Sequence, residues 1–254
     1  LAAPGVSARR TGALAIDLRT GEVVFEANAA RGLAPASAEK LAVSFAALRV
    51  LGPGFRFRTE VIGNGQLVGT TWQGDLFLAG YGDPTLELGD LRKLAREVAE
   101  WGIRRVSGRI VGDERHFDTH RDAPGWRPWF LGIESPPLSA LTVDDVDVRG
   151  ANGSAVAAAK AFRAELERAG VRAPGRAVTG RVPAGAIILA DDLSVPLSAI
   201  VRRMNRESDN FVSEMLLKEL GATAETRGTT AAGGRVVRQA LVEAGIPVTG
   251  VRIV

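Results

Sequence analysis

The chain has 254 residues, of which 46% are hydrophobic and 24% are charged. This composition is typical of a globular protein with enough apolar material for a buried core. Cysteine is absent, which excludes disulfides, thiolate metal sites and cysteine nucleophiles. No apolar run approaches the length that crosses a bilayer. The formal net charge is +3, and the scattered basic residues, without interleaved aromatics, predict no nucleic-acid partner, although a mildly cationic surface suits an anionic polymer.

Alternating apolar residues and glycine turns predict mostly strands early in the chain, and apolar residues at helical spacing predict helices between them. In chain order, the expected elements of the first half are a hairpin of strands 13–16 and 23–25 turning at Thr20-Gly21, a helix from Ser37 to about Leu51, short strands within 57–79 separated at Asn64-Gly65 and Gln73-Gly74, a helix at 91–101 and a strand at 106–111.

The second half is predicted to be mainly helical, after an irregular stretch rich in proline, glycine and tryptophan. In chain order, the expected elements are a loop region at 116–137, a helix at 154–169 capped by Ser154, a strand at 187–189, a pair of helices on either side of Ser208 and a last helix at about 229–244.

The first of those helices opens with Ser37-Ala38-Glu39-Lys40. Residues i and i+3 share a helix face, so the Lys40 ammonium can reach the Ser37 hydroxyl. Burial would lower the pKa of Lys40 and let it take the serine proton. A helix N-cap at Ser37 followed by a surface lysine is the alternative interpretation of the same residues.

A second motif, Ser208-Asp209-Asn210, falls at the junction between the paired helices. Side chains at such a junction can leave the helical surface and point into a cleft. The alternative is that Ser208 or Asp209 only caps the second helix. Ser-x-x-Lys followed by Ser-Asp-Asn is, with a third motif Lys-Thr-Gly, the signature of penicillin-binding proteins and class A β-lactamases.

With these motifs, the chain resembles the class C low-molecular-mass penicillin-binding proteins, which are serine DD-carboxypeptidases and DD-endopeptidases of peptidoglycan. The likeness extends over nearly the whole chain. It is carried by stretches outside the two motifs, namely Gly80-Tyr81-Gly82-Asp83-Pro84-Thr85-Leu86, Gly112-Asp113, Phe117-Asp118, Pro124-Gly125-Trp126, Pro136-Pro137-Leu138-Ser139-Ala140-Leu141-Thr142-Val143 and Asp192-Leu193-Ser194-Val195-Pro196-Leu197.

The third motif of that family, Lys-Thr-Gly, is not found in the chain. The four lysines of the chain are Lys40, Lys93, Lys160 and Lys218, and none is followed by Thr-Gly. Arg19-Thr20-Gly21 is interpreted as the hairpin turn. We therefore expect the chain to be the front part of a longer protein, whose remainder is absent here or forms a separate C-terminal chain.

The resemblance implies an α/β (α+β) fold, in which a penicillin-binding, serine β-lactamase-like domain with an antiparallel sheet and helices is interrupted by a long inserted module of mixed α and β structure. We expect residues 1–58 and 191–254 to form the penicillin-binding domain, incomplete at its C-terminus, and residues 59–190 to form the insert between the two motifs. An ordinary serine β-lactamase, which has no such insert, is disfavoured.

The resemblance also implies a mechanism. Ser37 would attack the carbonyl of a D-Ala-D-Ala bond, Lys40 would be its general base, Ser208 would relay a proton to the leaving amine and Asn210 would hold the substrate amide. Asp209 would have an orienting role at most. The implied partners are peptidoglycan stem peptides and β-lactams as covalent inhibitors, the location is extracytoplasmic, and no cofactor is expected. A non-catalytic peptidoglycan-binding relative is the alternative.

Three further patterns are assigned ordinary structural roles. His116 and His120, with Asp118 between them, could chelate a divalent ion on a helix, but the surrounding residues favour a loop, so no metal site is predicted. Glycines near Asn64 lack the spacing of a dinucleotide site. Trp126 and Trp129 could stack on a sugar, although burial under the proline-rich loop is favoured.

Overall fold

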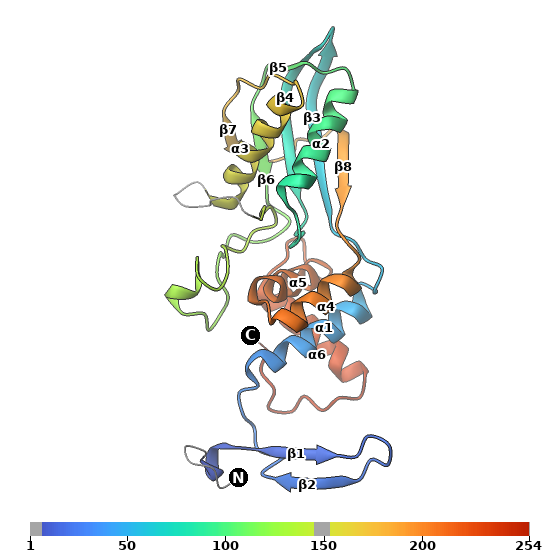
Figure 1. The fold of residues 1–254 in the computed structure, drawn as a ribbon, viewed down its shortest axis with the longest axis vertical. Helices are drawn as coiled ribbons and strands as arrows, with labels where there is room; N and C mark the ends of the chain where they lie inside the picture. Colours follow the sequence, from blue (N-terminus) through green and yellow to red (C-terminus); the bar gives the residue numbers. More distant parts are fainter. Residues whose placement is uncertain (1–6, 145–152, 254) are drawn as a thin grey trace.

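The computed structural model describes residues 7–144 and 153–253, which form two packed regions and a hairpin. A mixed sheet with two helices forms the upper region of Figure 1, four helices form the region below it, and the hairpin lies at the bottom. No helix within these ranges is both long and apolar enough to span a membrane.

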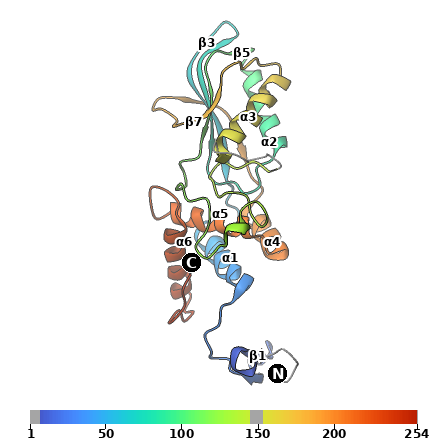
Figure 2. The same ribbon diagram turned by 90° about the vertical axis from the view of Figure 1, so that its left-hand side faces the viewer.

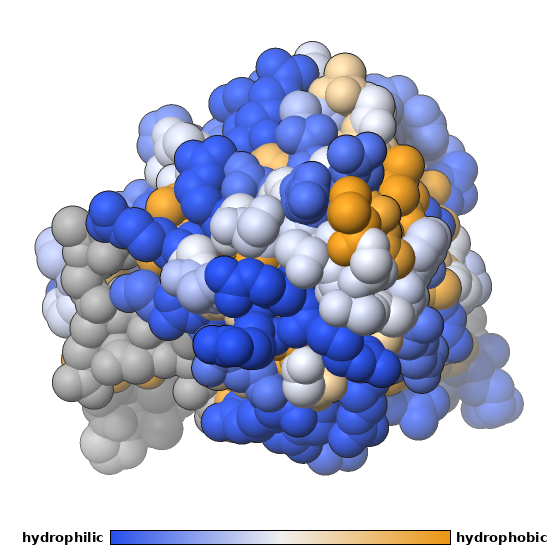
Figure 3. Space-filling model, turned by 90° about the horizontal axis from the view of Figure 1, so that it is seen from above, coloured by the Kyte–Doolittle hydropathy of each residue, from blue (hydrophilic) through white to orange (hydrophobic). Residues whose placement is uncertain are grey.

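The sheet has the strand order β7-β6-β4-β3-β8, with β5 paired beside β4. Its long central strands are antiparallel, whereas β4, β6 and β7 run parallel to one another. The strands are β3 (Arg58–Val68), β4 (Thr71–Gly80), β5 (Arg105–Val106), β6 (Ile110–Asp113), β7 (Ala177–Thr179) and β8 (Ile187–Leu193). Seen from above, this end of the molecule is mostly hydrophilic, with a cluster of hydrophobic residues to one side (Figure 3).

Helices α2 (Leu88–Glu100) and α3 (Gly153–Arg168) cover one face of the sheet (Figure 2). Successive side chains of a strand point to opposite faces, and β4 follows this rule. Leu76 and Leu78 pack in the core beneath the two helices, whereas Phe77 and Ala79 belong to a smaller cluster on the other face. The alternation of the sequence therefore supplies both faces of the sheet.

The second region packs α1 (Glu39–Val50), α4 (Leu197–Glu207), α5 (Asn210–Ala222) and α6 (Thr230–Glu243) around a separate apolar core. Helices α5 and α6 approach closely at Gly233, where a Cβ would lie 1.8 Å from the Leu217 carbonyl oxygen. Glycine is therefore required at this position for the two helices to pack as they do.

The chain passes between the two regions at two adjacent points. The Ser194 N–H donates to the Phe57 carbonyl at 3.0 Å, and the Phe57 N–H donates to the Ser194 hydroxyl at 2.9 Å. The two segments that connect the helical region to the sheet, one before β3 and one after β8, are thus held side by side. The boundaries predicted at 58/59 and 190/191 remain a prediction.

The predicted hairpin consists of β1 (Ala13–Ile16) and β2 (Val23–Ala27), with a short 3₁₀ turn η1 (Ala8–Arg10) before it. Its apolar side chains are exposed, and Val24 is 69% accessible. A two-stranded hairpin has little stability of its own. In Figure 1 this hairpin nevertheless lies apart from both packed regions.

Three sequence-based expectations are wrong in detail. Asn64-Gly65 and Gln73-Gly74 do not separate short strands, because Gly65 and Gly74 face each other inside β3 and β4. A Cβ on Gly65 would lie 2.1 Å from the Gln73 carbonyl oxygen, so the glycines allow close strand pairing. The strand expected at 106–111 is split into β5 and β6. Ser154 lies inside α3 and does not cap it.

A buried ion pair fixes the irregular loop, which contains the 3₁₀ turn η3 (Pro128–Phe130), to α5. The Lys218 side chain of α5 is fully buried, and its ammonium lies 2.5 Å from the Asp118 carboxylate and 3.2 Å from the His120 carbonyl. Beside it, His116 Nε2 lies 2.7 Å from the Glu219 carboxylate. The loop thus supports the outer side of α5.

Replacing Asp118 with asparagine should destabilise the fold by about 3–5 kcal/mol, because it leaves the buried Lys218 ammonium without its counter-ion. Urea denaturation of the two proteins measures this difference. Glu225→Gln is the matched control, since the Arg235–Glu225 pair is exposed and such pairs contribute about 0–1 kcal/mol. Equal destabilisation by both variants would contradict the structural role of Lys218.

The same pair predicts a pH dependence of stability. Burial alone would raise the pKa of Asp118, but the hydrogen bond and charge of Lys218 outweigh it and hold that pKa below its ordinary value. A carboxylate with a lowered folded pKa stabilises the fold above about pH 4 and loses this contribution as pH falls through the folded pKa. The difference between the wild-type protein and Asp118→Asn should therefore shrink in denaturation experiments below about pH 4.

Candidate active site

Ser37 and Lys40 lie at the start of α1. Ser37 belongs to a 3₁₀ turn, η2 (Ala36–Ala38), and Lys40 to the first turn of the α-helix. Ser37 is exposed, whereas Lys40 is 8% accessible, and the lysine Nζ lies 3.3 Å from the serine Oγ. Because Ser37 makes no side-chain cap and Lys40 is buried, the alternative of a capped helix with a surface lysine is wrong.

Ser208 lies between α4 and α5 in the left-handed conformation, at φ 58° and ψ 37°. A non-glycine residue rarely adopts this conformation, and such residues cluster at functional sites. The turn aims the Ser208 hydroxyl at Ser37, whose Oγ it meets at 2.7 Å. Asp209 caps α5 by accepting a hydrogen bond from the Val212 N–H, so the capping interpretation holds for Asp209 and not for Ser208.

Asn210, the first residue of α5, completes the cluster. Its Oδ1 accepts a 2.8 Å hydrogen bond from Lys40 Nζ, across 170 residues of sequence. The structure therefore brings together Ser37, Lys40, Ser208 and Asn210, all four of the residues predicted from the sequence. Lys40 contacts both motifs at once, so it links α1 to α5.

The surroundings of Lys40 favour its neutral form. Burial lowers the pKa of Lys40 below its ordinary value, and the negative charges of Asp209, Glu214 and Glu39 offset part of this effect. A lysine must lose its proton before it can accept one from a serine. Burial therefore prepares Lys40 to act as a base.

Two polar residues near the cluster were missed in the sequence. Glu214 lies one helical turn after Asn210, and its Oε2 is buried with no hydrogen-bond partner among the described residues. Burial raises the pKa of Glu214 to about 7. Asn205 of α4 accepts a hydrogen bond from Ser44 of α1 at 3.0 Å. Asn210, Glu214 and Lys218 recur every four residues and so share one face of α5, which was the available signal for Glu214, whereas Asn205 offered none.

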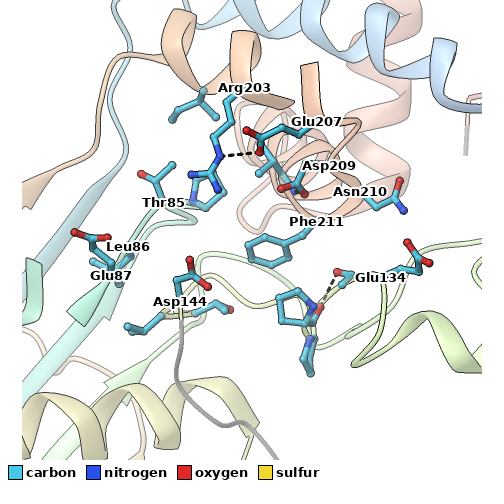
Figure 4. Close-up of a pocket in the computed structure, with 18 of the residues that line it drawn as sticks. Thr85, Leu86, Glu87, Glu134, Asp144, Arg203, Glu207, Asp209, Asn210 and Phe211 are labelled. Carbon is cyan, nitrogen blue, oxygen red and sulfur yellow. Dashed lines mark hydrogen bonds and ion pairs between the residues drawn. The ribbon is translucent and has the colours of Figure 1, made fainter. Parts of the chain in front are cut away.

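A cavity of about 680 Å³ adjoins the cluster. One wall comes from α4 and α5, including Arg203, which is paired with Glu207 at 3.0 Å. The facing wall comes from the loops after β4 and before α3, where Thr85, Glu134 and Asp144 lie (Figure 4). Ser208 and Asn210 line the same cavity, so a bound molecule would lie between the helices and these loops, next to Ser37.

The histidines and tryptophans do not join the cluster. His116 contacts Glu219, while Asp118 is held by Lys218, and no group of three metal-ligand side chains lies together within the described ranges. Trp126 is partly buried and stacks on Phe130, but Trp129 is 50% accessible. Burial of Trp129 under the loop is therefore a wrong expectation.

A serine hydroxyl in contact with a buried lysine and with a second serine is the arrangement of serine acyl-transfer enzymes. The sequence matches the D-Ala-D-Ala carboxypeptidase 3 (S13) family over residues 1–151 and 146–254, and the chain belongs to this family. It is thus a member of a family of carboxypeptidases that includes penicillin-binding proteins.

Relatives agree with this assignment. The chain is 30% identical to the D-alanyl-D-alanine carboxypeptidase of Actinomadura sp. (strain R39), over 97% of this chain and 60% of that protein. It is 26% identical to the D-alanyl-D-alanine carboxypeptidase DacB of Haemophilus influenzae, over 94% of this chain and 49% of that protein. The chain therefore spans about half the length of the curated relatives it matches.

The fold is also that of a solved relative. Penicillin-binding protein 4 (dacB) from Haemophilus influenzae superposes with a TM-score of 0.82 at 21% identity, over 93% of this chain and 68% of that one. A second structure of that protein, complexed with a β-lactam, gives a TM-score of 0.70. The shared architecture is an α/β fold with a mixed sheet and helices.

Replacing Glu214 with glutamine should lower the pKa of Lys40 further, because it removes a negative charge that favours the ammonium. The four lysines of the chain permit a direct titration of ¹³C-labelled lysine side chains by NMR. Glu225→Gln, which changes an exposed carboxylate far along the chain, should leave the Lys40 titration unchanged. A Lys40 titration that moves upward in Glu214→Gln would contradict the assigned electrostatics.

Proposed function

We propose that this chain, with further residues of a longer protein, is a serine DD-carboxypeptidase or DD-endopeptidase that cleaves D-Ala-D-Ala-type bonds of peptidoglycan through an acyl-enzyme on Ser37. One observation carries the proposal most strongly. The exposed Ser37 hydroxyl is in contact with both Lys40 and Ser208. Lys40 would take the proton of this hydroxyl, and Ser208 would deliver a proton to the leaving amine.

In the first step, Ser37 Oγ forms a bond to the substrate carbonyl carbon as its proton passes to neutral Lys40 Nζ. The C–N bond to the terminal residue then breaks, and the leaving amine receives a proton through the Ser208 hydroxyl. Positioned proton transfer of this kind contributes about 10²–10⁴ in rate. Water next attacks the acyl carbon and gives a proton to Lys40. That proton passes on to Ser37 Oγ as the ester C–O bond breaks, which releases the shortened peptide as its acid and restores the serine hydroxyl.

Asn210 has two roles in this scheme. Its Oδ1 accepts a hydrogen bond from Lys40 Nζ and holds it in place, while its NH₂ group remains a donor for the carbonyl of a substrate amide. This supports the assignment of Asn210 as a substrate-binding residue, since it lines the cavity in which the peptide would lie.

The oxyanion of the tetrahedral intermediate needs donors. The Ser37 backbone N–H would supply one, and a second would come from the Lys-Thr-Gly motif, which this sequence does not contain. Removing one such donor typically lowers kcat by about 10²–10³. Full turnover is therefore assigned to the longer protein, in which residues 1–58 and 191–254 are part of the penicillin-binding domain and residues 59–190 are the insert.

β-Lactams would acylate Ser37 by the same route and be released slowly. In support, a relative of the same fold has been solved with a β-lactam bound. Because peptidoglycan lies outside the cytoplasm, an enzyme that acts on it would work there.

Ser37→Ala should abolish covalent labelling by benzylpenicillin in the longer protein, because it removes the nucleophile. Intact-mass spectrometry under denaturing conditions detects the adduct, and peptide mapping places it. Ser198→Ala is the matched control, since Ser198 is an exposed serine on α4 and should be labelled as the wild type. Persistent labelling of Ser37→Ala would disprove the nucleophile.

Ser208→Ala should slow acylation by about 10²–10⁴ while leaving the fold unchanged, because the proton relay is lost. The rate of adduct formation measures this effect. Binding of muropeptides by the longer protein, with no acylation and no turnover, would favour the non-catalytic alternative.

A further inference from the structure

The outer edge of the sheet carries two neighbouring hollows. One, here the α3 hollow, has a volume of about 460 Å³ and lies between α3 and edge strand β7. The other, here the Arg227 hollow, has a volume of about 300 Å³ and lies between the end of β7 and the loop after β6. Thr179 lines both, so they meet at the end of β7, the edge strand labelled in Figure 2.

Basic side chains gather along both hollows. Lys160, Arg163 and Arg176 line the α3 hollow. Arg115, Arg181 and Arg227 line the Arg227 hollow. The six positive charges, which are scattered in the sequence, therefore form one track from α3 along β7 to the loop between α5 and α6. We call these six residues the β7 track.

Four of these six cations have no counter-ion among the residues that the structure describes. The side chains of Lys160, Arg176, Arg181 and Arg227 make no hydrogen bond or ion pair with any residue of the described ranges. Arg163 donates to the Gly175 carbonyl. Of the residues at 7–144 and 153–253, none that lines the α3 hollow is acidic.

The acidic residues near the Arg227 hollow are already engaged. Asp113 forms an ion pair with Arg115 at 2.9 Å. Glu114 pairs with Arg121 at 2.5 Å, and Asp118 with the buried Lys218 at 2.5 Å. Their charges are thus compensated internally, and the cations that remain would favour an external polyanion.

The lining also indicates which polyanion fits. Proteins that bind single-stranded nucleic acid combine a basic groove with exposed aromatic rings on which bases stack. In the part of the chain that the structure describes, Phe117 is the one aromatic residue lining either hollow, and it is 2% accessible. Arginine matches the geometry of phosphate oxygens through its planar fork of donors. The track is therefore suited to phosphates on a chain without bases.

We propose that the β7 track binds a base-free phosphodiester polymer of the cell wall. The choice of a wall polymer as its source rests on the proposed function, because only an enzyme of peptidoglycan would meet it. Each exposed contact is weak by itself, but several along one polymer release condensed counterions together. Such binding would retain the enzyme on the wall while stem peptides enter the cavity beside Ser37.

The test uses the longer protein and a fluorescently labelled poly(glycerol phosphate) oligomer, with affinity measured by anisotropy at several salt concentrations. The triple variant Lys160→Gln, Arg176→Gln, Arg181→Gln should bind the oligomer at least about tenfold more weakly. Each lost phosphate contact lowers the slope of log affinity against log salt by roughly 0.7, so the slope should fall by about 2. Arg49→Gln, Arg96→Gln, Arg202→Gln removes the same charge from exposed positions elsewhere and should change affinity less than about twofold.

Equal weakening in both triple variants, or no binding by the wild-type protein, would overturn the proposal. Tighter binding of a single-stranded oligodeoxynucleotide with the same number of phosphates would overturn the assignment to a wall polymer. Benzylpenicillin labelling of Ser37 in the same samples tests the proposed function separately. Retained labelling with no polymer binding rejects the track alone, and polymer binding without labelling rejects the enzyme assignment alone.

Discussion

The hydrogen bond between Lys40 and Asn210 is the contact on which the site depends. It joins the first turns of α1 and α5, and it holds a lysine in a place where burial disfavours its charge. A buried lysine is costly unless its donors are satisfied. Here Asn210 and Ser37 accept hydrogen bonds from the Lys40 amine. Burial and the nearby charge of Glu214 act on its pKa, so the packing of the helices influences the protonation of Lys40.

The sheet that lies between the two motifs in the sequence participates in this arrangement through its loops. Phe117 and Leu138 pack against Met215 of α5, and Asp118 neutralises Lys218 on the same helix. One side of α5 therefore faces the catalytic cluster, and the other is fixed by the loop that follows β6. The same loops form the facing wall of the cavity. The region between the two motifs thus both supports the helix that carries Asn210 and shapes the space in front of it.

Short motifs and periodicity were sufficient to predict the four clustered residues and most helices. Ser37 and Lys40 share a helix face, and Ser208 follows an apolar helical pattern, so both motifs could be located. Tertiary contacts decided what failed. Gly65 and Gly74 look like turn glycines, but they allow two long strands to approach. Strand β7 is too short to show a pattern, and the left-handed backbone of Ser208 has no signature in a serine. The surroundings of Glu214 include Glu39 and Lys40 of α1, a helix that lies far away in sequence.

The separation of 171 residues between Ser37 and Ser208 also affects how the protein acquires reactivity during its synthesis. Ser37 and Lys40 leave the ribosome long before α5 exists, and in an unfolded chain Lys40 is fully hydrated and keeps its proton. Ser37 is then an ordinary alcohol. Contacts between distant segments form late, because the intervening loop must close first. In a nascent or unfolded polypeptide the proposed nucleophile would therefore be inert towards acylating agents, and the reactivity proposed for it would arise only when the intervening residues have folded and brought the two motifs together.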